Sequence, residues 1–173
     1  MDTKDQVSAT VPDWNRETVQ RGEWQPGRLL LRSIRKYQAA RARGGISALI
    51  ISRRWVLSHR FWSAISGSDI PINTKIEGGL AIPHPNGIVI HSNAKIGPNC
   101  LILQQVTLAG DLEGAPTLLG HVDVGAGAKI LGRVVIGEHA KIGANAVVLT
   151  DIPAGATAVG IPARIILNQD PTT

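Results

Sequence analysis

Aliphatic residues recur at every sixth position from Ile70 onward. Three registers carry this repeat: Ile70, Ile76, Ile82 and Ile88; then Ile90, Ile96, Ile102 and Leu108; then Val124, Ile130, Ile136, Ile142 and Val148. A helix repeats every 3.6 residues and a half-buried strand every two, so neither keeps a six-residue period. A longer period of this kind is typical of a solenoid, in which each unit packs on its neighbours.

Small residues accompany the aliphatic positions. Gly often follows directly and Ala often stands four places on, as at Gly97, Gly125, Gly137, Gly143, Ala94, Ala128, Ala140 and Ala146. We therefore predict a three-sided prism in which each six-residue unit forms one short side with its aliphatic residue inward. The register shifts by two residues at Val89 and by four between Leu108 and Val124. The second shift predicts that the segment 110–116 is a loop ejected from the prism, and such loops often carry function.

The pattern before the prism is helical. Leu29, Leu30, Ile34 and Tyr37 recur at three- and four-residue steps, with basic residues between them, and the pair Gly44-Gly45 separates this run from a second one. The expected fold class is thus mainly β, a parallel β-helix at residues 69–167 after an α-helical region at residues 21–68. Residues 1–20 and 168–173 are expected to be flexible tails.

Positive charge gathers in the helical region. Between Arg21 and Arg60 the chain carries ten Lys or Arg and one acidic residue, Glu23, whereas the whole chain has a net charge of +5. One interpretation is a solvated helix face that packs on the base of an oligomer. The other is peripheral contact with a membrane, since Arg with Trp and Leu suits anionic headgroups. No motif of a nucleic-acid-binding protein accompanies the charge, so nucleic acid is not an expected partner.

The amino-acid composition limits which kinds of core, covalent cross-link and location are expected. Hydrophobic residues make up 43% and aromatic residues 3%, which favours thin aliphatic layers over a bulky core. A single cysteine, Cys100, excludes an internal disulfide and a metal site built from cysteines. No secretory signal or apolar run of membrane-spanning length is visible, so a cytoplasmic location is expected.

Several segments of the repeat resemble the hexapeptide-repeat acyltransferases, and within them the serine acetyltransferases. They are Gly87-Ile-Val-Ile90, Leu103-Gln-Gln-Val-Thr-Leu108, Val124-Gly-Ala-Gly-Ala-Lys-Ile-Leu-Gly132, Lys141-Ile-Gly-Ala-Asn-Ala-Val-Val-Leu149 and Val159-Gly-Ile-Pro-Ala-Arg-Ile-Ile166. The resemblance covers roughly residues 69–167. It implies a left-handed β-helix, against the usual crossover rule, and an O-acetyltransferase that uses acetyl-CoA, needs no metal and forms a homotrimer.

The resemblance also implies a catalytic pair. The family's general base is a histidine oriented by an aspartate, and the matching residues are His84 and Asp69, fifteen positions earlier. A neutral imidazole would take the proton of the acceptor hydroxyl as it attacks the thioester, so transfer would be direct. Cys100 takes the place of a small residue in the repeat and is expected to be buried filler. His91, His121 and His139 fall at or near solvent-facing positions.

Coenzyme A is expected to lie in the groove between two prisms of the trimer. By resemblance, the residues that would line this groove are Gly110, Ala126, Ala144, Lys141 and Arg164. Small residues permit close backbone approach, and the two cations could meet phosphate.

The acceptor site departs from the family pattern. The serine enzymes carry an aspartate where this chain has Pro83, and an Arg-His pair where it has Gly114 and Ala115. A free amino acid needs partners for its charges, so the expected acceptor is a sugar hydroxyl, as in an exopolysaccharide precursor. The residues expected near it are Pro83, Asn86, His91, Gly114 and Ala115. Three alternatives stay open: L-serine as the acceptor, a β-helix that only presents a binding surface, and a zinc enzyme with a related prism that uses His84, His91 and His121.

Overall fold

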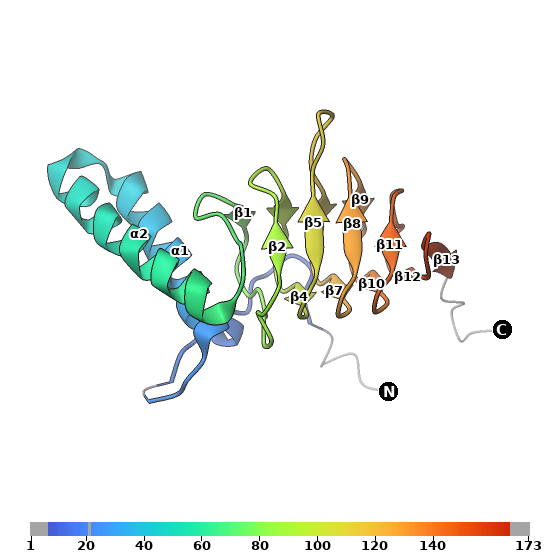
Figure 1. Ribbon diagram of the computed structural model, residues 1–173, viewed down its shortest axis with the longest axis horizontal. Coiled ribbons are helices and arrows are strands. Elements are labelled where there is room, and N and C mark those ends of the chain that lie inside the picture. Colours follow the sequence, from blue (N-terminus) through green and yellow to red (C-terminus); the bar gives the residue numbers. More distant parts are fainter. Residues whose placement is uncertain (1–6, 21, 167–173) are drawn as a thin grey trace.

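Three short-stranded sheets form the sides of a prism in the computed structural model, which describes residues 7–20 and 22–166 (Figure 1). Sheet A contains β2 (Val89–Ile90), β5 (Thr107–Ala109), β8 (Lys129–Leu131) and β11 (Val147–Val148). Sheet B contains β1 (Lys75–Ile76), β3 (Lys95–Ile96), β6 (Thr117–Leu118) and β9 (Val135–Ile136). Sheet C contains β4 (Leu101–Ile102), β7 (Asp123–Val124), β10 (Lys141–Ile142), β12 (Thr157–Val159) and β13 (Arg164–Ile166).

Neighbouring strands of each sheet are parallel and come from successive coils, so the chain winds around one axis. Ile90, Leu108, Ile130 and Val148, for example, follow one another along sheet A, and each is at most 2% exposed. This confirms the predicted left-handed parallel β-helix with its aliphatic positions inward. Only the last pair departs, because β13 runs antiparallel to β12.

Three columns of turns form the corners of the prism. The AB corner follows sheet A and contains residues 71–74, 91–94, 110–116, 132–134 and 149–151. The BC corner contains residues 77–80, 97–100, 119–122, 137–140 and 153–156. The CA corner precedes the next strand of sheet A and contains residues 83–88, 103–106, 125–128 and 143–146. The two register shifts of the sequence are the longer turns 83–88 and 110–116, and the latter rises as a loop beyond β5 in Figure 1.

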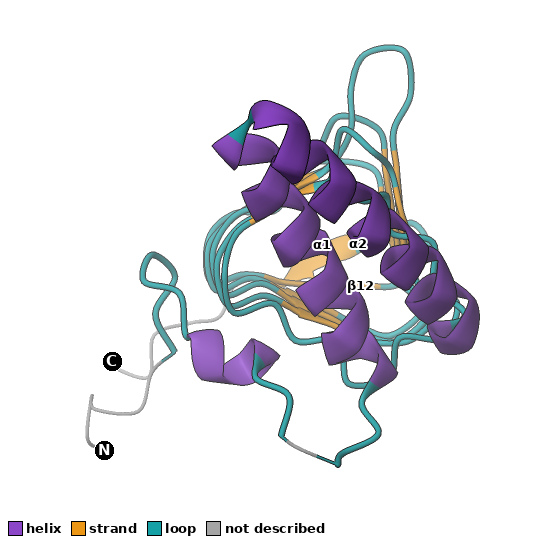
Figure 2. Cartoon of the chain, turned by 90° about the vertical axis from the view of Figure 1, so that its left-hand side faces the viewer, coloured by secondary structure: helices purple, strands orange, loops and turns teal. Residues whose placement is uncertain are grey.

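A helical hairpin closes the end of the prism at which the first coil lies (Figure 2). Helix α1 (Pro26–Arg43) and helix α2 (Gly45–Ser66) are separated at Gly44, whose φ of 68° suits a residue without a side chain. Leu30, Leu31 and Ile34 of α1 are at most 1% exposed and join the core of the prism. Helix α2 is fastened to the first coil through His59, whose Nε2 lies 2.8 Å from the carbonyl oxygen of Ile70.

The segment 7–20, which we expected to belong to a flexible tail, instead packs on the prism. It contains the 3-10 helix η1 (Trp14–Glu17). The buried side chain of Asn99 donates to the carbonyls of Ser8 and Val11 and accepts from the amide of Asp13, at 2.7–2.8 Å. Glu17 then pairs with Arg35 of α1 at 2.8 Å. These long-range contacts hold the segment, whereas residues 1–6 and 168–173 lie outside the described part.

Candidate functional site

The three histidines considered for a metal site lie at three different corners. His84 is in the first CA corner, His91 in the second AB corner and His121 in the third BC corner. Within the described ranges, no three His, Cys, Asp or Glu side chains gather where they could hold a metal ion. Among the described residues of one chain, these three histidines are therefore not brought to a common site.

His84 and Asp69 lie near the two ends of the first coil, at the same edge of the prism. Asp69 pairs with Val89 in a parallel bridge, and the amide of Gly87 donates to the carbonyl of Gly67 at 2.7 Å, which brings the two segments side by side. Both side chains are exposed, and among the described residues no hydrogen bond or ion pair joins them. The structure thus brings together the segments that carry the predicted base and its partner, and leaves both side chains open to a ligand.

Asn86 is built into the backbone around His84. Its side-chain nitrogen lies 2.6 Å from the position that a Cβ on Gly67 would take. Its backbone carbonyl accepts a hydrogen bond from the amide of Gln105 at 2.9 Å. Gly67 has a φ of 64°, a left-handed conformation that glycine adopts without strain, and a side chain there would have to displace that of Asn86. Asn86 therefore links the end of α2 to the turn that carries His84.

The residues predicted to bind coenzyme A divide into two groups. Ala126 and Ala144 stack in the CA corner, where the amide of Asn145 donates to the carbonyl of Ala126 at 2.8 Å. Lys141 and Arg164 are exposed on sheet C nearby. The coils pack closely here, since a Cβ on Gly125 would lie 2.6 Å from the backbone nitrogen of Ala144. A wall of small residues with two exposed cations fits a long ligand that carries phosphates.

Gly110, the fifth predicted coenzyme A residue, lies at the opposite edge of sheet A from this wall. It follows the carboxyl end of β5, whereas the CA corner precedes the amino ends of the same parallel strands. The first group and Gly110 are thus not brought together within one chain.

The ejected loop places a histidine and an arginine beside the predicted substrate residues. A Cβ on Gly110 would lie 2.9 Å from Nδ1 of His91 and 3.0 Å from Cβ of Ala115. A Cβ on Gly114 would lie 3.0 Å from Cγ of Arg133 in the next coil. Arg133 is exposed, and in the described part of the chain its guanidinium has no assigned hydrogen bond. Our sequence prediction did not include Arg133, because the contact depends on how the loop folds back over the following coil.

Pro83, which precedes His84 in the chain, lines a cavity of about 290 Å³. The other side chains that matter there are Arg16, Trp24 and Arg28, from the segment before α1 and from its first turn. Arg16 donates to the carbonyl of Asn99, and Arg28 donates to that of Thr18 at 2.7 Å. Two arginines that line the cavity are therefore each bonded to a backbone carbonyl.

His121 and His139 lie on successive coils at the BC corner and contact each other. Their Nδ1 atoms are 2.8 Å apart and their rings meet edge to face at 4.9 Å. Both residues have a positive φ, a conformation that His and Asn adopt more readily than most residues. Burial lowers the pKa of His121 from its ordinary 6.5, against the opposing effect of Asp123.

The lowered pKa of His121 should make folding stability depend on pH. Because the folded chain lowers the pKa of His121, its contribution is complete above pH 6.5 and decreases as the pH falls toward the lowered value. We expect the melting temperature to fall between pH 7 and pH 5, and to fall less in His121→Asn, which keeps the positive φ. Thermal unfolding followed by circular dichroism measures both; parallel curves for the two proteins would contradict the assignment.

Cys100 is fully buried, as predicted, and burial raises its pKa to about 11. Its Sγ lies 3.1 Å from the carbonyl oxygen of Leu119. A buried thiol with so high a pKa holds almost no thiolate at neutral pH, so it is a poor nucleophile.

No family model matches the chain, but individual proteins and structures do. The chain is 41% identical over 141 residues to a serine acetyltransferase of Synechocystis sp., an overlap of 70% of this chain and 55% of the relative. A Helicobacter pylori serine acetyltransferase is 48% identical over 106 residues, or 59% of this chain and 62% of the relative. The soybean serine acetyltransferase solved with serine has a TM-score of 0.70 at 34% identity and covers 82% of this chain and 57% of its own.

The β-helix is thus similar, in sequence and in fold, to the serine acetyltransferases of the hexapeptide-repeat superfamily. A serine acetyltransferase solved with CoA is also similar, with a TM-score of 0.70 at 35% identity over 83% of this chain and 58% of the other. These comparisons confirm the predicted resemblance. The chain spans between 39% and 62% of the length of the curated relatives considered.

Proposed function

We propose that the protein is an acetyl-CoA-dependent O-acetyltransferase whose general base is His84. The observation that supports this most is 41–48% identity to proteins named serine acetyltransferase, together with an exposed His84 at the same edge of the prism as Asp69. A module that only presents a surface, the non-catalytic alternative, would not need this arrangement.

In the proposed reaction, His84 takes the proton of the acceptor hydroxyl while that oxygen attacks the thioester carbonyl. Asp69 would orient the ring and stabilise the imidazolium, and backbone amides would hold the oxyanion. Breakdown of the tetrahedral intermediate breaks the carbon–sulfur bond, and the imidazolium returns its proton to the departing thiolate. The products are the acetyl ester and the free thiol, and His84 is again neutral.

The cosubstrate would lie along the wall formed by Ala126, Ala144, Lys141 and Arg164. Gly110 and the ejected loop lie at the opposite edge of sheet A. A groove between two protomers of a trimer, to which each chain presents one edge, would bring both groups of residues to the same ligand.

We propose L-serine as the acceptor, in place of the sugar that we first expected. The sugar prediction rested on the absence of charged partners at Pro83, Gly114 and Ala115. In the folded chain, Arg133 covers Gly114, and His91 lies beside Gly110 and Ala115. A guanidinium that is free to bind a carboxylate is therefore present at the loop, and the names of the relatives favour the same acceptor.

Thiol release from acetyl-CoA tests the activity and the acceptor together. We expect release that depends on L-serine and is at background with a panel of hexoses. Release with a sugar alone would keep the transferase and replace the acceptor. Background release with every acceptor, and no rise in melting temperature with saturating coenzyme A, would favour the non-catalytic module.

Arg133→Gln tests the carboxylate contact. Loss of a charge-assisted hydrogen bond to the acceptor should raise the KM for L-serine roughly tenfold or more, while kcat changes little. Lys95→Gln, which removes an exposed cation from sheet B, is the matched control. Steady-state kinetics with L-serine measure both, and equal KM values for the two variants would remove Arg133 from the acceptor site.

A further inference from the structure

The outer face of α2 is apolar although it is exposed. Ile46, Ile50, Leu57 and Phe61 are 82%, 66%, 67% and 55% exposed. Their spacing of four, seven and four residues places them on one side of the helix. The buried residues of α2, which include Ala48 and Ser52, lie on the other side toward α1. We call the four exposed residues the α2 stripe.

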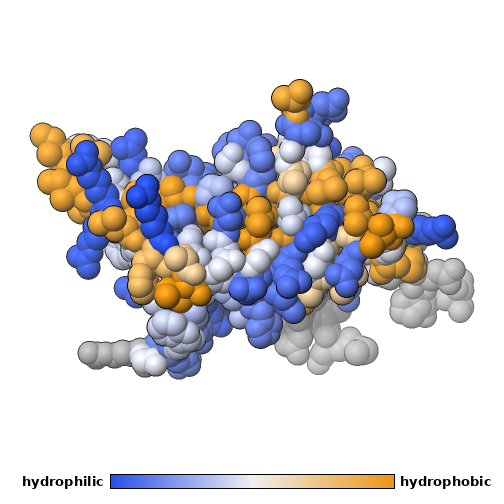
Figure 3. Space-filling view, viewed as in Figure 1, coloured by the Kyte–Doolittle hydropathy of each residue, from blue (hydrophilic) through white to orange (hydrophobic). Residues whose placement is uncertain are grey.

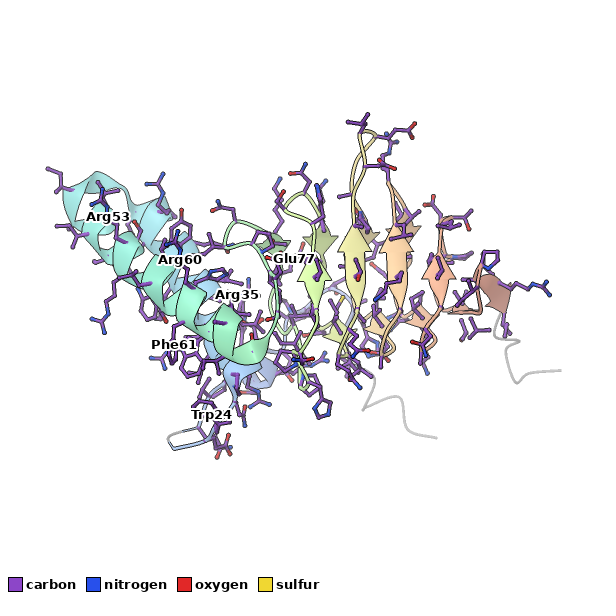
Figure 4. The ribbon with its side chains drawn as sticks, in the orientation of Figure 1. Trp24, Arg35, Arg53, Arg60, Phe61 and Glu77 are labelled. Carbon is purple, nitrogen blue, oxygen red and sulfur yellow. The ribbon has the colours of Figure 1, made fainter. Side chains whose placement is uncertain are left out.

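Arginines flank the α2 stripe on both sides. Arg53 and Arg60 lie on one side of it and Arg54 on the other, and all three are exposed. Helix α1 carries six Lys or Arg and α2 carries three, and neither contains an acidic residue. Figure 3 shows apolar surface at the free end of the hairpin interrupted by hydrophilic side chains, and Figure 4 shows Arg53 and Arg60 on the hairpin.

An aromatic cluster lies beside the last turns of the α2 stripe. The ring of Trp62 meets Trp24 edge to face at 5.8 Å and Phe61 at 5.0 Å. Trp24 is 71% exposed although it belongs to this cluster. Large rings that are exposed next to arginines suit the boundary between water and lipid headgroups, where aromatic residues are enriched.

We propose that the α2 stripe binds the surface of an anionic phospholipid bilayer. The apolar side chains enter the headgroup region, and the flanking arginines contact lipid phosphates. No helix among residues 7–20 and 22–166 is long and apolar enough to span a membrane, so α2 lies in the plane of the interface. This occupant accounts for the apolar face and for the one-signed charge around it.

A second copy of the chain fits the same face less well. Two α2 stripes packed on each other would bring arginines of both chains into one interface, and neither α1 nor α2 has an acidic side chain to pair with them. Like charges brought together in this way oppose association. A bilayer with anionic lipids supplies the opposite charge.

Docking through α2 would leave the catalytic candidates free. The hairpin covers one end of the prism, while sheets A and C and their corners extend away from it (Figure 1). None of the residues of the α2 stripe belongs to the proposed coenzyme A or acceptor sites. Lipid binding and acetyl transfer can therefore be measured separately.

Flotation with vesicles tests the proposal. We expect the full chain to float with vesicles of phosphatidylcholine and phosphatidylglycerol at 7:3 and to stay behind with pure phosphatidylcholine. The double variant Ile50→Ser/Leu57→Ser, and the triple variant Arg53→Gln/Arg54→Gln/Arg60→Gln, should each weaken binding roughly tenfold or more. The matched controls are Leu149→Ser for the apolar variant and Lys75→Gln/Lys95→Gln for the arginine variant. Leu149 is 54% exposed in the wild type, and both controls should bind like the wild type.

The same variants distinguish a bilayer from a second copy. If the α2 stripe covers another chain, the two α2 variants will lower the molar mass measured by light scattering, and no protein will float with anionic vesicles. That result would overturn the proposal, as would equal binding to neutral vesicles or equal binding by the α2 variants and their controls. Retention of the thermal shift with coenzyme A in all variants would show that the prism is intact.

Discussion

Replacing His84 with alanine is expected to lower turnover by about a hundredfold or more, because the acceptor hydroxyl then loses the group that takes its proton. His84 is exposed in a corner of the first coil and has no assigned hydrogen bond among the described residues, so its removal should leave folding intact. Thiol release at saturating acetyl-CoA and acceptor measures kcat. The melting temperature, alone and with coenzyme A, shows whether fold and cosubstrate binding remain.

His139→Asn is the matched control for His84→Ala. It also removes an imidazole from a corner of the prism, but at the BC corner, and Asn tolerates the positive φ of that position. We expect its turnover to stay close to that of the wild type. Near-normal turnover in His84→Ala, or an equal loss in both variants, would remove His84 from the mechanism.

Replacing Leu108 with alanine is expected to destabilise the chain by about 2–5 kcal/mol, the range seen when a buried leucine leaves a cavity. Leu108 is fully buried in the third coil and stacks between Ile90 and Ile130 of its neighbours. The prism is thin, so few other side chains can move into the space. Urea unfolding followed by circular dichroism gives the change in the free energy of unfolding.

The variant Val89→Ala tests whether the stability lost in Leu108→Ala comes from burial of the side chain. Val89 lies on the same sheet but faces outward and is 42% exposed, so we expect a change within about 0.5 kcal/mol. Similar losses in the two variants would mean that the six-residue register does not define the core.

The prism could be predicted because its signal is repetitive. Each inward position, such as Ile96 or Ile130, is supported by others six residues away, and the sheets stack them in register. The packing of residues 7–20 could not be predicted in this way. It depends on the single side chain of Asn99, which reaches residues 86 to 91 positions earlier in the chain.

The candidate site was predictable only in part, for a related reason. A period of about eighteen residues places His84 near Asp69. The same period brings His121 against His139, although the sequence analysis placed these two histidines only at or near solvent-facing positions. Arg133 escaped prediction because its neighbour Gly114 belongs to the loop that breaks the repeat. The interruption of a regular pattern removes the register from which neighbours could be inferred.

The two ends of the prism are covered by elements that its middle lacks, and these elements limit how many coils can stack. The helical hairpin covers the first coil, and β13 turns back against β12. A reversed strand offers the wrong direction for another parallel coil, so end-to-end growth into fibres has no template there. The number of coils is therefore limited by these two caps, and an inner coil could be duplicated without creating a new adhesive edge.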